Sequence, residues 1–221
     1  MLKKLDRIII NLKQRKRIAG IAVIVAVAVL TATLLLIAIA PPGSEVVARV
    51  NGEAITAGEV TKQRVKAYEF YRTRISEEGA LEQLIAETLL YQEAEQQGYA
   101  ISMDEAEQEL EARVASTNRT MEDFEADLAK SSFSYEEYLQ DFQRQLAINN
   151  YLDDSIEVPE VTKLEARIFY EDYKQQHTEL EYPPFEQLES QIIALLKQQK
   201  QQEATSLLIE KLKDKADIQY K

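Results

Sequence analysis

The chain has 221 residues, with 26 lysines and arginines, 38 aspartates and glutamates, one histidine and no cysteine. These counts exclude a disulfide framework, a thiolate metal site, a cysteine nucleophile and a site built from two histidines. The net charge of -12 argues against a nucleic-acid-binding surface. The sequence marks out no acid–base pair and no glycine-rich phosphate loop, so we expect no catalytic residue, no cofactor and no metal.

The basic residues gather at the N-terminus. Residues 1–40 carry seven basic residues and one acidic residue, and 18–40 is an uncharged run of 23 residues. As a helix rising about 1.5 Å per residue, this run spans roughly 35 Å, which exceeds a hydrocarbon core of about 30 Å. Because basic flanks stay in the cytoplasm, the pattern predicts a cytoplasmic segment 1–17 and a transmembrane signal anchor 18–40. The acidic remainder then lies on the outer face of the cell membrane.

A cleaved signal peptide is the alternative, since Ala38 and Ala40 form a small-x-small site. The apolar run is longer than a signal-peptide core, and Pro41 would follow the cut. These two features favour an uncleaved anchor, followed by a linker at 41–45. The absence of cysteine excludes lipoprotein processing.

The first elements after the linker are short and extended. Residues 46–50 are rich in valine, Asn51-Gly52 is a hairpin turn signal, and 53–56 forms a second extended piece. From about Gly58 the apolar spacing becomes helical and continues toward Ile75.

Six helix signals follow in chain order. An i, i+3, i+4, i+8 stripe from Leu81 predicts a helix that stops at Gly98. Capping boxes predict helices that start at Ser102, Ser134 and Thr162, and Thr120 predicts a shorter one. Pro183-Pro184 begins the longest helix, which runs to about Ala216.

Residues 217–220 resemble a terminal strand. The β-like pieces therefore lie at the two ends of the acidic part, and a lone strand would leave its backbone groups unmatched. We expect the N- and C-terminal strands to pair. The predicted fold class is mainly α: a single-pass anchor followed by one helical domain at 46–220 with these strands paired.

Aromatic residues are the strongest candidates for a functional surface. Consecutive aromatics such as Phe70 and Tyr71 cannot all face one core. They either line a groove between helices or pack ordinarily with tyrosine hydroxyls in water. The expected peptide-binding residues are Tyr68, Phe70, Tyr71 and Phe142. His177 is expected to be a solvated residue near a helix end, and Asn118 begins a weak N-glycosylation pattern.

Several segments resemble a known family. The segments are 47–56 (VARVNGEAIT), 81–94 (LEQLIAETLLYQEA) and 134–139 (SYEEYL), which resemble the N-terminal domain of SurA/PrsA-type extracytoplasmic foldases. Segment 161–170 resembles the helix that leads into their parvulin prolyl isomerase module, and 182–220 resembles the helix and strand that follow it. The resemblance implies a chaperone frame whose helices form a cradle for unfolded polypeptide.

The parvulin module itself is missing from this pattern. Gln176 and Tyr182 lie too close together to contain it, and no residue here matches the isomerase histidines. The resemblance therefore implies a membrane-anchored holdase for unfolded or newly translocated proteins, without enzymatic activity. The alternative is a membrane-tethered scaffold or adaptor that docks one folded partner, and an isomerase is the least supported hypothesis.

Overall fold

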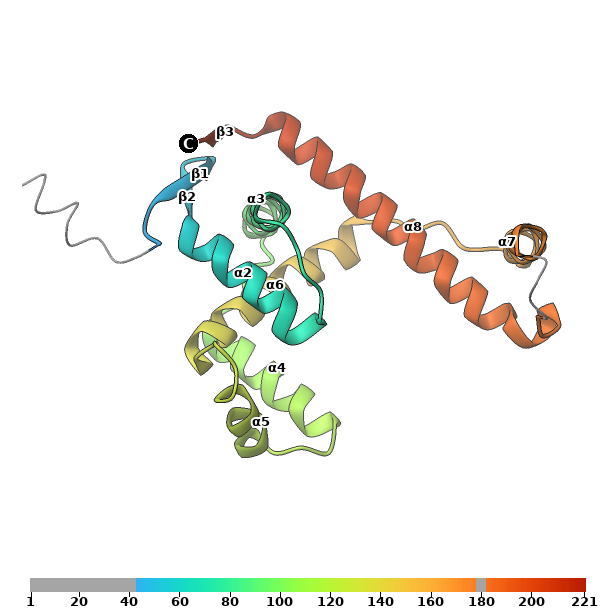
Figure 1. The fold of residues 1–221 in the computed structure, drawn as a ribbon, viewed down its shortest axis with the longest axis horizontal. Coiled ribbons are helices and arrows are strands. Elements are labelled where there is room, and N and C mark those ends of the chain that lie inside the picture. Colours follow the sequence, from blue (N-terminus) through green and yellow to red (C-terminus); the bar gives the residue numbers. More distant parts are fainter. Residues whose placement is uncertain (1–42, 178–181) are drawn as a thin grey trace, which may run out of the picture. The chain divides into compact units, whose positions relative to one another are not determined.

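Among the residues that the structure describes, three short strands bring the segment that begins at Val46 beside the C-terminal end (Figure 1). Strand β1 (Val46–Val50) lies between β2 (Glu53–Thr56) and β3 (Ile218–Tyr220), and both pairings are antiparallel. The predicted pairing of the terminal strands is confirmed. The β1–β2 turn has φ of 52° at Asn51 and 90° at Gly52, as a two-residue hairpin requires.

The structure is a computed structural model that describes residues 43–177 and 182–221. The predicted cytoplasmic segment 1–17 and signal anchor 18–40 lie outside these residues. Among the helices that are described, none is long and apolar enough to cross a membrane. Residues Val46–Lys221 form one compact unit.

Helices make up most of this unit, as predicted. Their bounds are α2 Ala57–Tyr71, α3 Glu77–Gln96, α4 Met103–Ser116, α5 Met121–Leu128, α6 Tyr135–Ser155, α7 Lys163–Gln176 and α8 Phe185–Lys215. The predicted caps at Ser102, Thr120, Ser134 and Thr162 are all present, each with a reciprocal capping box.

Helix α2 ends earlier than the apolar spacing predicts. The sequence pattern carries the helix toward Ile75, but α2 stops at Tyr71. Arg72 adopts a left-handed conformation with φ of 53°, and its N–H donates to the carbonyls of Ala67 and Tyr68. Such a cap satisfies the last carbonyls of the helix and turns the chain away, so the prediction was wrong at this boundary.

Helix α3 is the centre of the packing. Its buried Ile85 and Leu89 pack with the sheet, and Leu90 and Ala94 pack with the C-terminal part of α6. The C-terminal half of α8 covers both of these clusters through Leu212.

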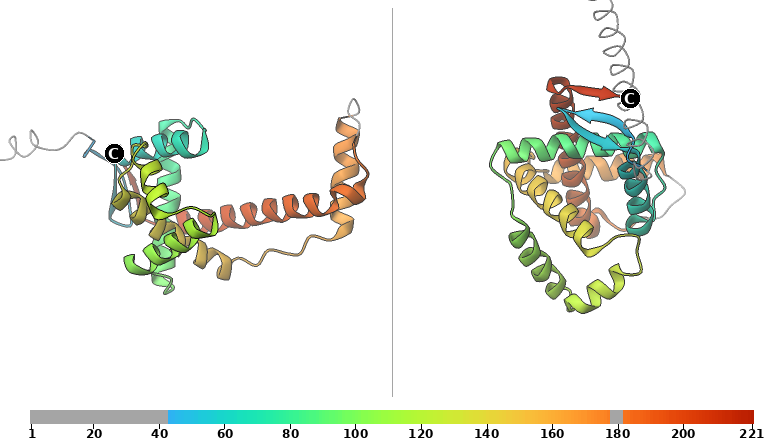
Figure 2. Two further views of the ribbon diagram at one scale, coloured as in Figure 1. Left: turned by 90° about the horizontal axis from the view of Figure 1, so that it is seen from below. Right: turned by 90° about the vertical axis from the view of Figure 1, so that its left-hand side faces the viewer.

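Two smaller clusters lie beyond this centre. The N-terminal part of α6 packs with α4 and α5 around Leu110 and Leu139. At its other end, α8 packs with α7 around Tyr170 and Phe185, so α8 runs from α7 to the sheet (Figure 2).

The central position of α3 predicts a large effect for Ile85→Ala. Ile85 is fully buried, so its truncation leaves a cavity, and we expect a loss of about 2–5 kcal/mol in the free energy of unfolding. Urea unfolding followed by circular dichroism measures this loss. The matched control is Ile168→Ala on α7, where the side chain is 53% exposed, and its expected change is within about 0.5 kcal/mol. Equal effects of the two substitutions would contradict the placement of Ile85 in the core.

Candidate functional site

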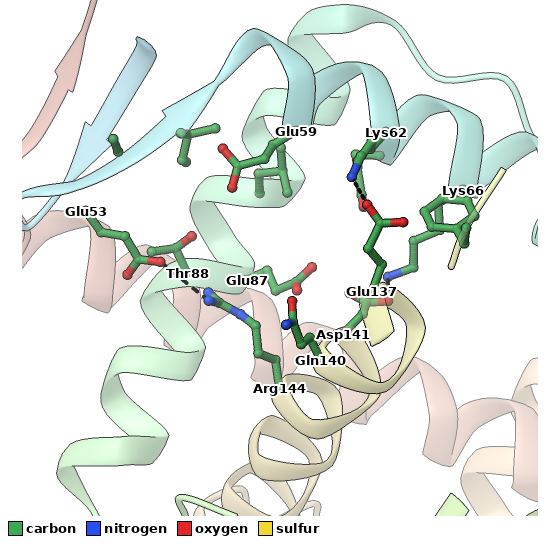
Figure 3. Close-up of a pocket in the computed structure, with 15 residues that line it drawn as sticks. Glu53, Glu59, Lys62, Lys66, Glu87, Thr88, Glu137, Gln140, Asp141 and Arg144 are labelled. Atoms are coloured by element: carbon green, nitrogen blue, oxygen red, sulfur yellow. Dashed lines mark hydrogen bonds and ion pairs between the residues drawn. The ribbon is translucent and has the colours of Figure 1, made fainter. Parts of the chain in front are cut away.

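A groove runs along α3, with α2 on one side and α6 on the other (Figure 3). It consists of two adjoining hollows with volumes of about 280 Å³ and about 690 Å³. We call it the α2–α6 groove. Both hollows are lined by Gln63, Lys66, Glu87, Phe133 and Asp141.

The smaller hollow forms a charged half, where ion pairs join the two walls. Lys62 and Lys66 are one turn apart on α2 and therefore share a face, as do Glu137 and Asp141 on α6. Lys62 pairs with Glu137, and Lys66 pairs with Asp141. These pairs hold α2 and α6 at a fixed separation across the groove.

Further polar contacts join the walls of the groove at its two ends. Glu69 of α2 accepts hydrogen bonds from the Ser132 N–H at 3.0 Å and from its hydroxyl at 2.8 Å. At the other end, Arg144 of α6 lies 3.4 Å from the Glu53 carboxylate and 4.3 Å from the centre of the Tyr91 ring. The groove is therefore framed by polar bridges from α6 to β2, α2 and α3.

The larger hollow forms an aromatic half. The Phe70 ring centre lies 5.5 Å from that of Phe133 and 6.3 Å from that of Tyr138. Tyr138 in turn stacks on Phe142 at 6.4 Å and meets Phe124 edge-on at 5.1 Å. Rings from α2 and α6 thus form one continuous aromatic surface.

Only some of the peptide-binding residues expected from the sequence lie on this aromatic surface. Phe70, Tyr71 and Phe142 line the larger hollow, whereas Tyr68 does not. Tyr68 precedes Phe70 by two residues, which is roughly 200° around a helix, so the two side chains leave opposite sides of α2. Phe70 is 43% and Tyr71 70% exposed.

The charged half was missed by the sequence analysis. Its signal is visible in hindsight: two lysines at i, i+4 on one helix and two acids at i, i+4 on another. Such spacing identifies a face of each helix but not the partner of that face. Phe133 and Tyr138 also line the larger hollow, and neither is among the expected peptide-binding residues.

The groove carboxylates have different electrostatic environments. The pKa of Glu137 is lowered to about 2, first by the hydrogen bond from Lys62 and then by those from the Ser134 N–H and hydroxyl. Burial raises the pKa of Glu87, against the partial compensation of Lys66. Burial also raises the pKa of Tyr138.

The other candidate residues have local roles. His177 is the C-cap of α7, where its Nδ1 lies 2.9 Å from the Tyr173 carbonyl oxygen and its ring stacks on Tyr173 at 4.3 Å. Asn118 is exposed, in the turn between α4 and α5, with φ of 56°. Within residues 43–177 and 182–221, no group of three or more histidine, cysteine or acidic residues is arranged to hold a metal.

Comparison with known proteins agrees with this architecture. The family model of the SurA-like N-terminal domain matches residues 8–152, which include β1, β2 and α2 to most of α6. The chain belongs to the SurA-like N-terminal domain family. A search of curated protein sequences gives no match.

The fold also resembles that of solved SurA-like chaperones. One such chain comes from the pair PEB4, a virulence factor, and Cj1289, a periplasmic protein, which are structurally related chaperones of the human pathogen Campylobacter jejuni. The match has a TM-score of 0.57 at 14% sequence identity and covers 80% of this chain and 98% of the other. In this chain only residues 177–184 join α7 to α8, and a folded module rarely forms below about 40 residues. No parvulin module is therefore inserted at this point.

The pKa of Glu137 predicts a specific loss of stability in acid. Because the folded-state pKa of about 2 lies below the ordinary value of 4.5, Glu137 stabilises the fold above pH 4.5. This stabilisation is lost progressively as the pH falls toward 2. In Glu137→Gln we expect a flatter decline of the unfolding free energy over this range than in the wild type, measured by urea titration at each pH.

The control for this measurement is Glu136→Gln, which removes the same charge one residue earlier, at an exposed position. Its pH profile should follow that of the wild type. If both variants decline alike, the ion pair of Glu137 with Lys62 does not contribute to the acid sensitivity.

Proposed function

We propose that the chain is an extracytoplasmic chaperone that holds unfolded polypeptide segments in the α2–α6 groove. The observation that carries this proposal is the aromatic half of the groove, in which Phe70 and Tyr71 are exposed beside Phe133, Tyr138 and Phe142. Soluble domains rarely leave a contiguous aromatic surface open to water unless another molecule covers it.

Client binding would replace water on these rings with apolar side chains of the unfolded chain. The ion pairs between α2 and α6 join the two walls beside these rings. The driving force is burial of apolar area, at about 25 cal/mol per Å², and it needs no nucleotide or other cofactor. A hollow of about 690 Å³ accepts only a few side chains, so affinity stays modest and release remains fast.

The proposal places this groove on the outer face of the cell membrane. Residues 18–40 would anchor the protein as a single transmembrane helix, with 1–17 in the cytoplasm. Newly translocated chains emerge close to such an anchor, which raises their local concentration around the groove. The periplasmic location of Cj1289 supports an extracytoplasmic site of action.

Truncating the aromatic half should weaken the holdase. With the full chain in lipid nanodiscs, we expect suppression of aggregation of a chemically unfolded model protein at near-stoichiometric ratios without ATP. The double variant Phe70→Ala, Phe142→Ala should need about tenfold more protein for half suppression, because buried aromatic anchors dominate binding surfaces. Light scattering measures the effect, with empty nanodiscs as the blank.

Tyr68→Ala is the matched control for that experiment. Tyr68 is 48% exposed on the same helix but lies outside the groove, so its truncation should leave suppression unchanged. Equal losses in the two variants would remove the groove from the proposal. Cross-linking in cells that captures one stoichiometric partner in place of many clients would favour the adaptor.

The anchor is tested separately by fractionation. We expect the full chain to remain in the membrane pellet after alkaline carbonate extraction, and a variant lacking 18–40 to be released, because the apolar run is the only proposed attachment. Protease added outside bacterial spheroplasts should digest the acidic part and spare a tag placed before Met1. Release of the full chain by carbonate would contradict the anchor.

A further inference from the structure

The cations that line the α2–α6 groove are all engaged by carboxylates. Lys62 pairs with Glu137, Lys66 with Asp141 and Arg144 with Glu53, and Arg113 of the larger hollow pairs with Glu109. The same lining contains two further carboxylates, Glu59 and Glu87. The groove therefore has an excess of negative charge.

The two remaining carboxylates differ in their hydrogen-bond and ion-pair partners. Glu59 is held in the capping box of α2, where it accepts hydrogen bonds from the N–H and the hydroxyl of Thr56, both at 2.7 Å. Among the ion pairs of the described residues, none includes Glu87. Glu87 accepts a hydrogen bond from the side chain of Gln145, and it lines both the charged and the aromatic hollow.

The partly buried position of Glu87 destabilises its charged form, because burial removes water from the carboxylate. Figure 3 shows its carboxylate pointing from α3 into the space between α2 and α6. Lys66 and Arg144 attract this carboxylate at longer range, but each already has an acidic partner, and Asp141 repels it. A partly buried carboxylate is stabilised most by a cation that reaches it directly.

We propose that Glu87 receives a lysine or arginine side chain of the bound client, so that the groove selects segments in which a basic residue lies next to aromatic residues. The aromatic side chains of the client would pack on Phe70, Tyr71 and Phe142, while its cation lies at the junction of the two hollows. The excess negative charge of the groove and the net charge of -12 both favour such a segment. This inference rests on the proposed function, since it assigns a substrate class to the same groove.

Three labelled peptides test the selection. Each is extended, carries two phenylalanines, and differs only at the position beside them, which is lysine, glutamine or glutamate. Fluorescence anisotropy measures their binding to the full chain. We expect the wild type to bind the lysine peptide about tenfold more tightly than the glutamine peptide, as for a charge-assisted hydrogen bond, and the glutamate peptide most weakly.

Two variants separate Glu87 from the overall charge. Glu87→Gln keeps the shape of the side chain, and Glu203→Gln removes the same charge from an exposed position on α8. In Glu87→Gln the lysine and glutamine peptides should bind equally, at the affinity that the wild type has for the glutamine peptide. In Glu203→Gln the preference for lysine should persist.

Zero-length carbodiimide coupling provides a test that needs no variant. It joins an amine to a carboxylate only where the two are in contact, and mass spectrometry of the wild-type complex then locates the lysine of the peptide. Coupling to Glu87 supports the inference, and coupling only to other carboxylates overturns it.

The remaining outcomes distinguish this inference from the proposed function. If all three peptides bind equally, or if the preference persists in Glu87→Gln, the inference is wrong and the holdase proposal stands. If the wild type binds none of the peptides and does not suppress aggregation, both are overturned.

Discussion

The pairing of β1 with β3 is the constraint on which the rest of the unit depends. Asn51 accepts a hydrogen bond from the Asp217 N–H through its side chain, and its own N–H donates to the Asp217 carbonyl at 2.8 Å. This contact joins residues that are 166 positions apart, and it fixes the end of α8 beside the sheet. Because α8 is held there, Leu208 and Leu212 can pack with the cluster that α3 and α6 share. The C-terminal part of α6 belongs to this cluster, so the closure at the far end of the chain supports the helix whose N-terminal part forms one wall of the groove.

The groove depends on two kinds of interaction between its walls. The Phe70 ring of α2 contacts those of Phe133 and Tyr138, with ring centres 5.5 Å and 6.3 Å apart. Beside these rings, Lys62 and Lys66 of α2 form ion pairs with Glu137 and Asp141 of α6. An exposed ion pair such as Lys62–Glu137 typically contributes about 0–1 kcal/mol, whereas Lys66, with a side chain 18% exposed, belongs to a more buried pair. Both interactions join the same two walls, and Phe70 and Tyr71 stay partly exposed between them.

The sequence predicts those features whose causes are local. Each capping box at Ser102, Ser134 and Thr162 lies within four residues of sequence, so its geometry does not depend on the fold. The end of α2 was predicted wrongly because Arg72 adopts the left-handed cap conformation. Such a cap is usually marked by glycine, and no glycine is present here to indicate it in the sequence. The groove was predicted only in part: aromatic clustering indicated Phe70 and Tyr71, but the faces that meet across α3 are decided by tertiary packing.

The aromatic half is a departure from what stability alone would select. Burying the Phe70 and Tyr71 rings would gain free energy from the apolar area that they leave in water. Nothing local forces this exposure, since α2 has room for polar side chains at both positions, as at Gln63 on the same groove face. The charged half shows the same feature in Glu87, a carboxylate kept in a partly buried position without an ion-pair partner among the described residues. Such local costs are typical of functional sites, and here two of them of opposite chemical character meet in one groove. A single occupant that is both apolar and basic would relieve both.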